Sequence, residues 1–100
     1  MAEIKIDGRK KVKTLKAEFK KAFGASLRVY SKKHFADEDA TLASIREGNA
    51  PGGELKVGGN MQVGNFEKKV KELYGIEVQV ANAADTALAD NSKTLVAAGK

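Results

Sequence analysis

Hydrophobic and polar positions alternate along this chain with two different periods. Residues 3–6 (EIKI) and 54–57 (ELKV) alternate polar and apolar side chains, which predicts strands with one buried face. LRVY at 27–30 and IEVQV at 76–80 predict two further strands. Between them, apolar residues recur at the i, i+4, i+7, i+8 spacing of an amphipathic helix. The predicted stripes are Leu15, Phe19, Ala22 and Phe23, and then Phe66, Val70, Leu73 and Tyr74.

Turn and cap residues divide these elements. DGR and GGN follow the first and third strands and carry the glycine that a tight turn favours, so residues 10–13 and 61–63 are candidate return strands. Thr14 and Asn65 are predicted helix N-caps because their side-chain oxygens can accept from first-turn amides. Gly24 and Gly75 are predicted to end the helices in a left-handed conformation.

The two halves of the chain repeat this pattern. A shift of 51 residues lays the first strand, turn, helix and strand over the second set, with apolar residues matching on the core positions. The closing phrases FADEDATLASI (35–45) and LADNSKTLVAA (88–98) then align at a shift of 53. We interpret this as an internal duplication, which makes residues 1–50 and 51–100 two similar halves.

The repeated closing phrase carries one aspartate in both copies. Asp37 and Asp90 each precede a short run rich in alanine and leucine, so we expect an aspartate cap on a single helical turn. Leu42, Ile45 and Leu95 would then close the open edge of the core.

Each half is therefore predicted to run strand, turn, strand, helix, strand, closing turn. This order resembles the ubiquitin-like β-grasp, whose last part also passes from a strand through an acidic turn into a Thr-Leu pair. The matching residues are Asp37, Thr41 and Leu42, and then Asp90, Thr94 and Leu95. If residues 10–13 and 61–63 are not strands, the alternative is a ferredoxin-like split βαβ sheet. Both interpretations give an α+β fold with two helices on one face of a mixed sheet.

A single domain is predicted from the length. Fifty residues bury too little surface to fold alone, so the halves of this 100-residue chain are expected to share one core. Residues 46–54 contain the only proline and are interpreted as the linker between the halves.

Charge is distributed unevenly between the halves. The net charge is +5, and residues 1–50 carry all of it. The basic residues of the first turn and helix form a candidate phosphate-binding face. They are Arg9, Lys10, Lys11, Lys13, Lys16 and Lys20. The favoured interpretation is a solvated helix face, because lysine predominates over the arginine that bidentate phosphate recognition prefers.

Other candidate chemistry is weaker. Asp37, Glu38 and Asp39 have the spacing of carboxylate ligands, but the second copy has Asn91 and Ser92 in the last two places, which suits a cap better than a cation site. The glycine pairs lack the Walker or dinucleotide spacing. His34 has no cysteine or evident serine partner for nucleophilic catalysis. We therefore expect no enzyme activity, metal or cofactor.

The leading hypothesis for function is a non-catalytic protein-interaction module with an unidentified protein partner. A small sheet leaves outer strands whose amides can accept a partner strand, while Lys5 and Lys56 would discourage such pairing. Candidate interface aromatics are Tyr30, Phe35 and Tyr74. The alternative hypothesis is nucleic-acid binding through the basic face. We expect a monomer or weak dimer, no membrane association and a cytoplasmic location.

Overall fold

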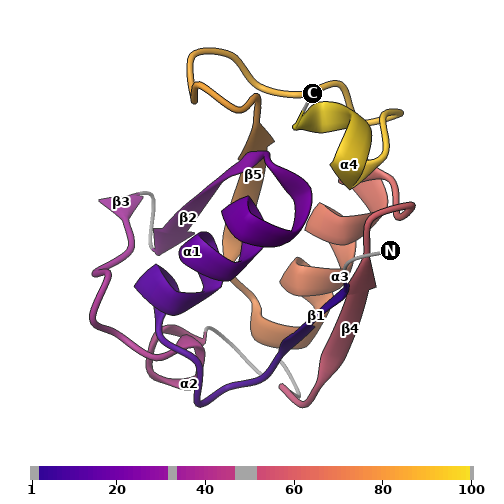
Figure 1. Ribbon diagram of the computed structural model, residues 1–100. Helices are drawn as coiled ribbons and strands as arrows, with labels where there is room; N and C mark the ends of the chain where they lie inside the picture. The colour runs from indigo at the N-terminus through magenta and orange to yellow at the C-terminus, as the bar shows by residue number, and fades with distance from the viewer. Residues whose placement is uncertain (1–2, 32–33, 47–51, 100) are drawn as a thin grey trace.

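Five strands form two antiparallel sheets in the computed structural model, which describes residues 3–31, 34–46 and 52–99 (Figure 1). The elements follow one another in the order β1 (Glu3–Ile6), α1 (Val12–Phe23), β2 (Ser26–Ser31), β3 (His34–Phe35), α2 (Leu42–Ile45), β4 (Leu55–Gly58), α3 (Val63–Tyr74), β5 (Glu77–Ala81) and α4 (Leu95–Ala98). The predicted α+β class is confirmed, and the four predicted strands correspond to β1, β2, β4 and β5.

The sheets join the two halves of the chain. β1 pairs with β4, with Ile4 opposite Val57. β2 lies between β3 and β5, with Leu27 opposite Val80. The predicted mixed sheet is wrong, because every pairing between the described strands is antiparallel and the strands form two sheets. β1 pairs with its counterpart β4, and β2 with its counterpart β5. Strands of the same half, such as β1 and β2, therefore do not pair in parallel.

The helices begin earlier than predicted. α1 starts at Val12 and α3 at Val63, so residues 10–13 and 61–63 do not form return strands. Lys11 and Gln62 hold the N-cap positions without a side-chain cap, and Thr14 and Asn65 lie inside the helices. Val12 and Val63 are both buried, and their burial favours a helix that begins at these residues.

Backbone carbonyls of the closing segments bind the first-turn amides of both helices. The Val12 N–H donates to Ala40 O (2.9 Å), and the Val63 N–H donates to Lys93 O (2.8 Å). These contacts satisfy donors that every helix leaves free at its start. The closing phrase thus stabilises each helix start through its backbone, which a search for capping side chains does not reveal.

Threonine, not aspartate, caps the short closing helices. Thr41 Oγ1 accepts from the Ser44 N–H and Thr94 Oγ1 from the Ala97 N–H, both at 3.2 Å. The predicted aspartate caps are wrong, since the carboxylates of Asp37 and Asp90 accept instead from the amide two residues later. Such a bond is an Asx turn, which shapes the loop before the helix.

The buried residues of both halves form one hydrophobic cluster. Phe19 of α1 and Phe66 of α3 meet there with ring centroids 5.3 Å apart. Leu42 and Leu95 are fully buried and Ile45 packs against the cluster, as predicted. The predicted C-caps are also confirmed, with Gly24 and Gly75 in the left-handed conformation.

Part of the predicted linker, residues 47–51, lies outside the described residues. Beyond it, the Gly52 N–H donates to Leu73 O (2.6 Å), which ties the start of the second half to α3. None of the helices described here has the length and apolar character needed to cross a membrane.

Candidate functional site

Carboxylates pair with much of the basic face of α1. Lys13 Nζ lies 2.9 Å from Asp39 Oδ1, and Lys16 Nζ lies 3.0 Å from Glu38 Oε1. The bond from Lys13 lowers the pKa of Asp39 and raises that of Lys13. Two of the three acidic residues that resembled a cation site, Glu38 and Asp39, therefore bind lysines of the same half. No cluster of three or more metal-ligating side chains occurs in the described part of the chain.

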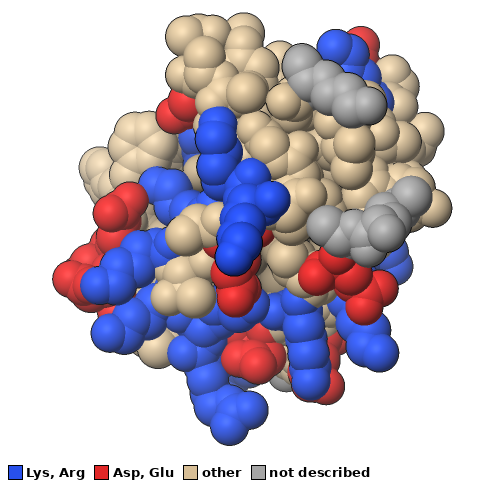
Figure 2. Space-filling view, in the orientation of Figure 1, with Lys and Arg blue, Asp and Glu red and all other residues tan. Residues whose placement is uncertain are grey.

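Lys10 and Lys20 bind the protein itself. Lys10 Nζ donates to the Glu18 carboxylate and to the backbone carbonyl of Lys5, while Lys20 Nζ donates to Ala83 O. Arg9 and Lys11 are exposed and form no ion pair with the described residues. Figure 2 shows the result, with basic and acidic side chains interleaved over the lower part of this face. The face is therefore a mixed-charge surface rather than a continuous basic patch.

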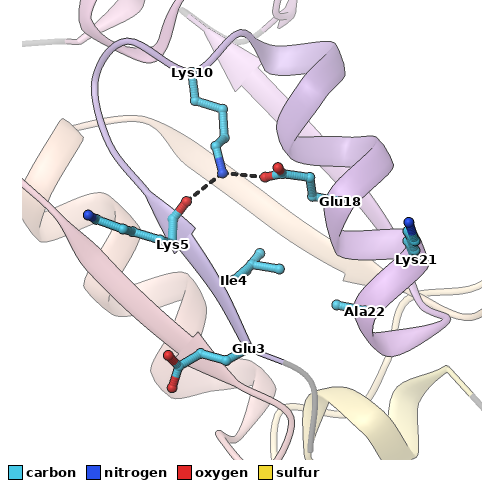
Figure 3. Close-up of a pocket in the computed structure, with 7 residues that line it drawn as sticks. All are labelled: Glu3, Ile4, Lys5, Lys10, Glu18, Lys21 and Ala22. Carbon is cyan, nitrogen blue, oxygen red and sulfur yellow. Dashed lines mark hydrogen bonds and ion pairs between the residues drawn. The ribbon is translucent and has the colours of Figure 1, made fainter.

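A shallow pocket lies beside Lys10, between β1 and α1 (Figure 3). Both acidic and basic side chains line it. The lining residues are Glu3, Ile4, Lys5, Lys10, Glu18, Lys21 and Ala22. Lys10 and Glu18 already bind each other, and Lys5 Nζ lies 2.6 Å from the Glu54 carboxylate outside it. These pairs leave few unsatisfied charges to recognise a ligand.

The three candidate aromatics occupy different environments. Tyr74 is in the core, where its hydroxyl donates to Ile6 O and Gly53 O, so it presents no surface to a partner. Burial raises the pKa of its hydroxyl. Tyr30 and Phe35 stack on each other, with ring centroids 5.0 Å apart and planes at 22°. Phe35 remains 70% exposed, which is unusual for a large apolar side chain.

The stacked pair lies on the solvent face of the three-stranded sheet. Leu27 and Val29 of β2 point into the core, so Arg28 and Tyr30 point outward. Tyr30 donates its hydroxyl to Gln79 Oε1 of β5 (3.0 Å), and Arg28 Nε donates to Asp85 Oδ1 (2.7 Å). These bonds hold Tyr30 and its neighbours in place and support the exposed ring of Phe35.

The backbone of Phe35 also faces outward. The Ala36 N–H donates to Val29 O (2.9 Å), so Val29 and Ala36 are a hydrogen-bonded pair of the antiparallel ladder. The next pair, Tyr30 and Phe35, is then a non-hydrogen-bonded pair, which brings the two rings close and turns the Phe35 N–H and C=O away from β2. No described residue bonds to either group. We call this outward side of His34–Phe35 the β3 edge.

The other outer strands have part of their backbone edge bonded, or carry a charge. On β5, the Val80 N–H donates to Glu67 Oε2 (3.1 Å) and Val80 O accepts from the Ala89 N–H (2.9 Å). On β1, Lys10 occupies the Lys5 carbonyl. On β4, the exposed Lys56 disfavours pairing with another strand. Among the strands described, β3 thus combines an open backbone edge with an exposed aromatic side chain.

Phe35 was predicted as an interface aromatic, but the strand that contains it was not predicted. Its connection to β2 has Lys32-Lys33 in place of the usual Asn-Gly or Asp-Gly, so no turn signal marked a hairpin. The role of Glu67 was missed as well. Its partial burial raises its pKa despite the hydrogen bond from the Val80 amide, and no sequence motif indicates such a contact.

Comparisons with known proteins give no family for this chain. No protein-family model, no curated protein sequence and no solved structure matches it.

Proposed function

We propose that this protein is a non-catalytic protein-interaction module whose contact site is the β3 edge. The observation that carries the proposal is Phe35, which joins an outward N–H and C=O to a 70% exposed ring. A partner strand could take the two backbone bonds and cover the ring, which is how β-strand addition combines affinity with side-chain specificity. The Tyr30 ring beneath Phe35 is already ordered, so binding would cost little conformational entropy there.

We also propose that the two halves arose by duplication. The supporting contacts recur at equivalent positions, since the Leu42 N–H donates to Lys10 O and the Leu95 N–H to Met61 O. The Asx turns at Asp37 and Asp90 recur in the same way. A duplicated scaffold leaves one half free to change its surface, and β3 belongs to the first half alone.

The alternative function, nucleic-acid binding through the basic face, receives less support. Lys10, Lys13 and Lys16 bind carboxylates within the chain, which lowers the charge that they could offer to phosphates. Arg9 and Lys11 are the exposed charges that favour this alternative.

Affinity capture from an extract with three forms of the chain tests the proposal. Leu88 is the matched control for Phe35, because these two are the exposed large hydrophobic residues of the described chain, at 53% and 70%. We expect wild type and Leu88→Ser to retain the same protein, and Phe35→Ser to lose it at least tenfold, given equal circular dichroism spectra. Equal capture by all three forms, or no capture together with no self-association, would overturn the proposal. Capture of oligonucleotide that declines with salt and ignores Phe35→Ser would favour the alternative.

A further inference from the structure

The Lys10 side chain binds the outward edge of β1. Its Nζ donates to the Lys5 carbonyl and to the Glu18 carboxylate, on the side of the strand that faces α1 (Figure 3). β1 pairs with β4 on its other side, so the backbone groups of Lys5 point away from β4, and those of Glu3, two residues earlier, do the same. An added strand would bond to these groups. Lys10 thus takes one of the places that a partner strand would occupy.

Lys10 is held unusually far from solvent for a lysine. Its side chain is 14% exposed, whereas lysine is among the residues least often buried. Burial of an ammonium group costs free energy unless the group is paired and hydrogen-bonded. Lys10 meets this condition through one bond to β1 and one to α1, across the shallow pocket between them. The Glu18 carboxylate therefore helps to hold the ammonium group at the Lys5 carbonyl.

The second half of the chain shows that the fold does not depend on this lysine. At the shift of 51 residues, Met61 corresponds to Lys10 and Lys69 to Glu18, so the same ion pair cannot form there. The backbone contact of the turn is nevertheless shared, since the Lys10 carbonyl accepts from Leu42 and the Met61 carbonyl from Leu95. An unbranched apolar side chain is therefore sufficient at this turn, and the charge of Lys10 calls for another explanation.

The two paired strands β1 and β4 differ in how far their own lysines oppose further pairing. Lys56 of β4 is exposed, and no ion pair joins it to the described part of the chain, so its charge disfavours an added strand. Its counterpart in β1, Lys5, lies 2.6 Å from the Glu54 carboxylate, which offsets that charge. β1 is therefore the strand of this pair that gains more from a second form of protection.

We propose that Lys10 prevents two copies of this chain from pairing through β1. The strand is complementary to itself, because an antiparallel copy centred on Ile4 sets Glu3 of each chain opposite Lys5 of the other. The backbone groups of these two residues point outward, so each opposite-charge pair would also be a hydrogen-bonded pair of the joined ladder. Lys10 occupies the Lys5 carbonyl that this ladder needs. The inference concerns β1 and does not rest on the function proposed for the β3 edge.

Sedimentation velocity of Lys10→Met tests this inference with the residue that the second half has at the same turn. A twofold pairing gains the freed carbonyl twice, so we expect association roughly tenfold or more tighter than that of wild type, with an unchanged circular dichroism spectrum. Lys21→Met is the matched control. Lys21 is exposed and lines the same pocket, so this variant makes the same change of charge and side chain and should behave as wild type. Equal association of Lys10→Met and wild type, or an equal gain in both variants, would overturn the inference.

Glu18→Gln gives a second measurement that keeps Lys10 in the chain. It removes the charge that pairs with the ammonium group, so Lys10 is held less firmly at the Lys5 carbonyl. We expect a smaller gain in association than Lys10→Met produces. This variant also decides the question if Lys10→Met fails to fold, because no gain in a folded Glu18→Gln chain would then overturn the inference.

A charge exchange in the Lys10→Met chain tests the strand and its register. Glu3→Lys places lysine opposite Lys5 of the other copy and should reverse most of the gain, while Lys5→Glu in the same chain should restore it. Glu72→Lys makes the same change of net charge on the exposed face of α3 and should leave the gain intact. Failure of the double exchange to restore association would contradict antiparallel pairing through β1.

The inference and the proposed function can fail separately. Phe35→Ser in the Lys10→Met chain should leave the gain unchanged, because β3 belongs to the other sheet. A gain that disappears with Phe35→Ser would place the association at the β3 edge, which overturns the role of Lys10 and leaves the proposed function standing.

Discussion

The two halves of this protein share a framework and differ at their sheet edges. In residues 3–46 and residues 52–99, a strand leads to a twelve-residue helix, a second strand and a short closing helix. In each half the closing segment binds the start of the long helix through backbone carbonyls. The two long helices bury residues at the same four positions, whereas the sheet edges differ.

One pair of equivalent positions shows how the edges diverge. Lys16 of α1 reaches Glu38 in its own closing segment. The equivalent residue of α3 is Glu67, whose carboxylate accepts from the Val80 N–H at the β5 edge. The second half therefore uses its helix to bind one outward amide of its outer strand, at Val80, whereas the first half adds β3 beside β2 and leaves Phe35 at the new edge.

This difference supports placing the proposed contact surface in the first half. An outer strand with unpaired amides invites association, and a carboxylate bonded to one of those amides blocks it. The second half has such a block and the first half has an exposed aromatic ring in its place. The framework is thus shared, while the site is proposed for only one half.

The largest expected effect tests whether the closing helices contribute equally. Leu42 and Leu95 are both fully buried, so Leu42→Ala and Leu95→Ala should each reduce the free energy of unfolding by about 2–5 kcal/mol. Chemical denaturation followed by circular dichroism and by tyrosine fluorescence measures this. Because both leucines belong to one cluster, the two probes should report a single transition in each variant. Two separate transitions would mean that the halves unfold independently.

A smaller effect should distinguish the glycines at the closing helices. A Cβ at Gly99 would lie 2.1 Å from Phe23 O, a backbone atom at the end of α1. A Cβ at Gly8 would lie 3.1 Å from the Ala43 Cβ of α2, where a small shift relieves the contact. We expect Gly99→Ala to cost about 1–3 kcal/mol and Gly8→Ala less than about 1 kcal/mol, measured by the same denaturation. Equal losses would show that both closing helices can shift to the same extent.

Local patterns predicted the parts of the fold that depend on local physics. Alternation identified β1 and β4, the helical stripes identified the buried faces of α1 and α3, and Gly24 and Gly75 marked the helix ends. Each of these signals is contained within a few residues. The aspartate caps were misassigned because aspartate and threonine are both good N-caps, and only the backbone geometry shows which one precedes the helix.

Sheet arrangement could not be obtained in the same way. The pairing of β1 with β4 joins residues some fifty positions apart, and no local pattern states which strand meets which. β3 escaped detection because it has two residues, too few for any alternation to appear. The proposed site was therefore predicted as a residue, Phe35, and as an outer strand in general, but not as the edge of β3. The lysines of the basic face were predicted without the carboxylates that bind them.

The smallest expected effect concerns Glu67 and depends on pH. Burial raises the pKa of this carboxyl, so the folded protein favours its protonated form more than the unfolded chain does. Its contribution to stability is then greatest at low pH and is lost as the pH rises through the raised pKa. Glu67→Gln stays neutral and keeps an oxygen that can accept from the Val80 N–H. We expect this variant to match wild type in acid and to exceed it by roughly 0.5 kcal/mol or less near neutral pH.

Thermal denaturation of both forms across this pH range measures the difference. Glu72→Gln is the control, because Glu72 is exposed on the same helix and its substitution should not reproduce the pH-dependent gain. Asp39 and Asp90 have lowered pKa values and therefore contribute stability that is lost in acid, but they are common to all three forms and cancel in the comparison. A Glu67→Gln variant that is less stable than wild type at neutral pH would show that the charge on Glu67, and not only its oxygen, holds the β5 edge closed.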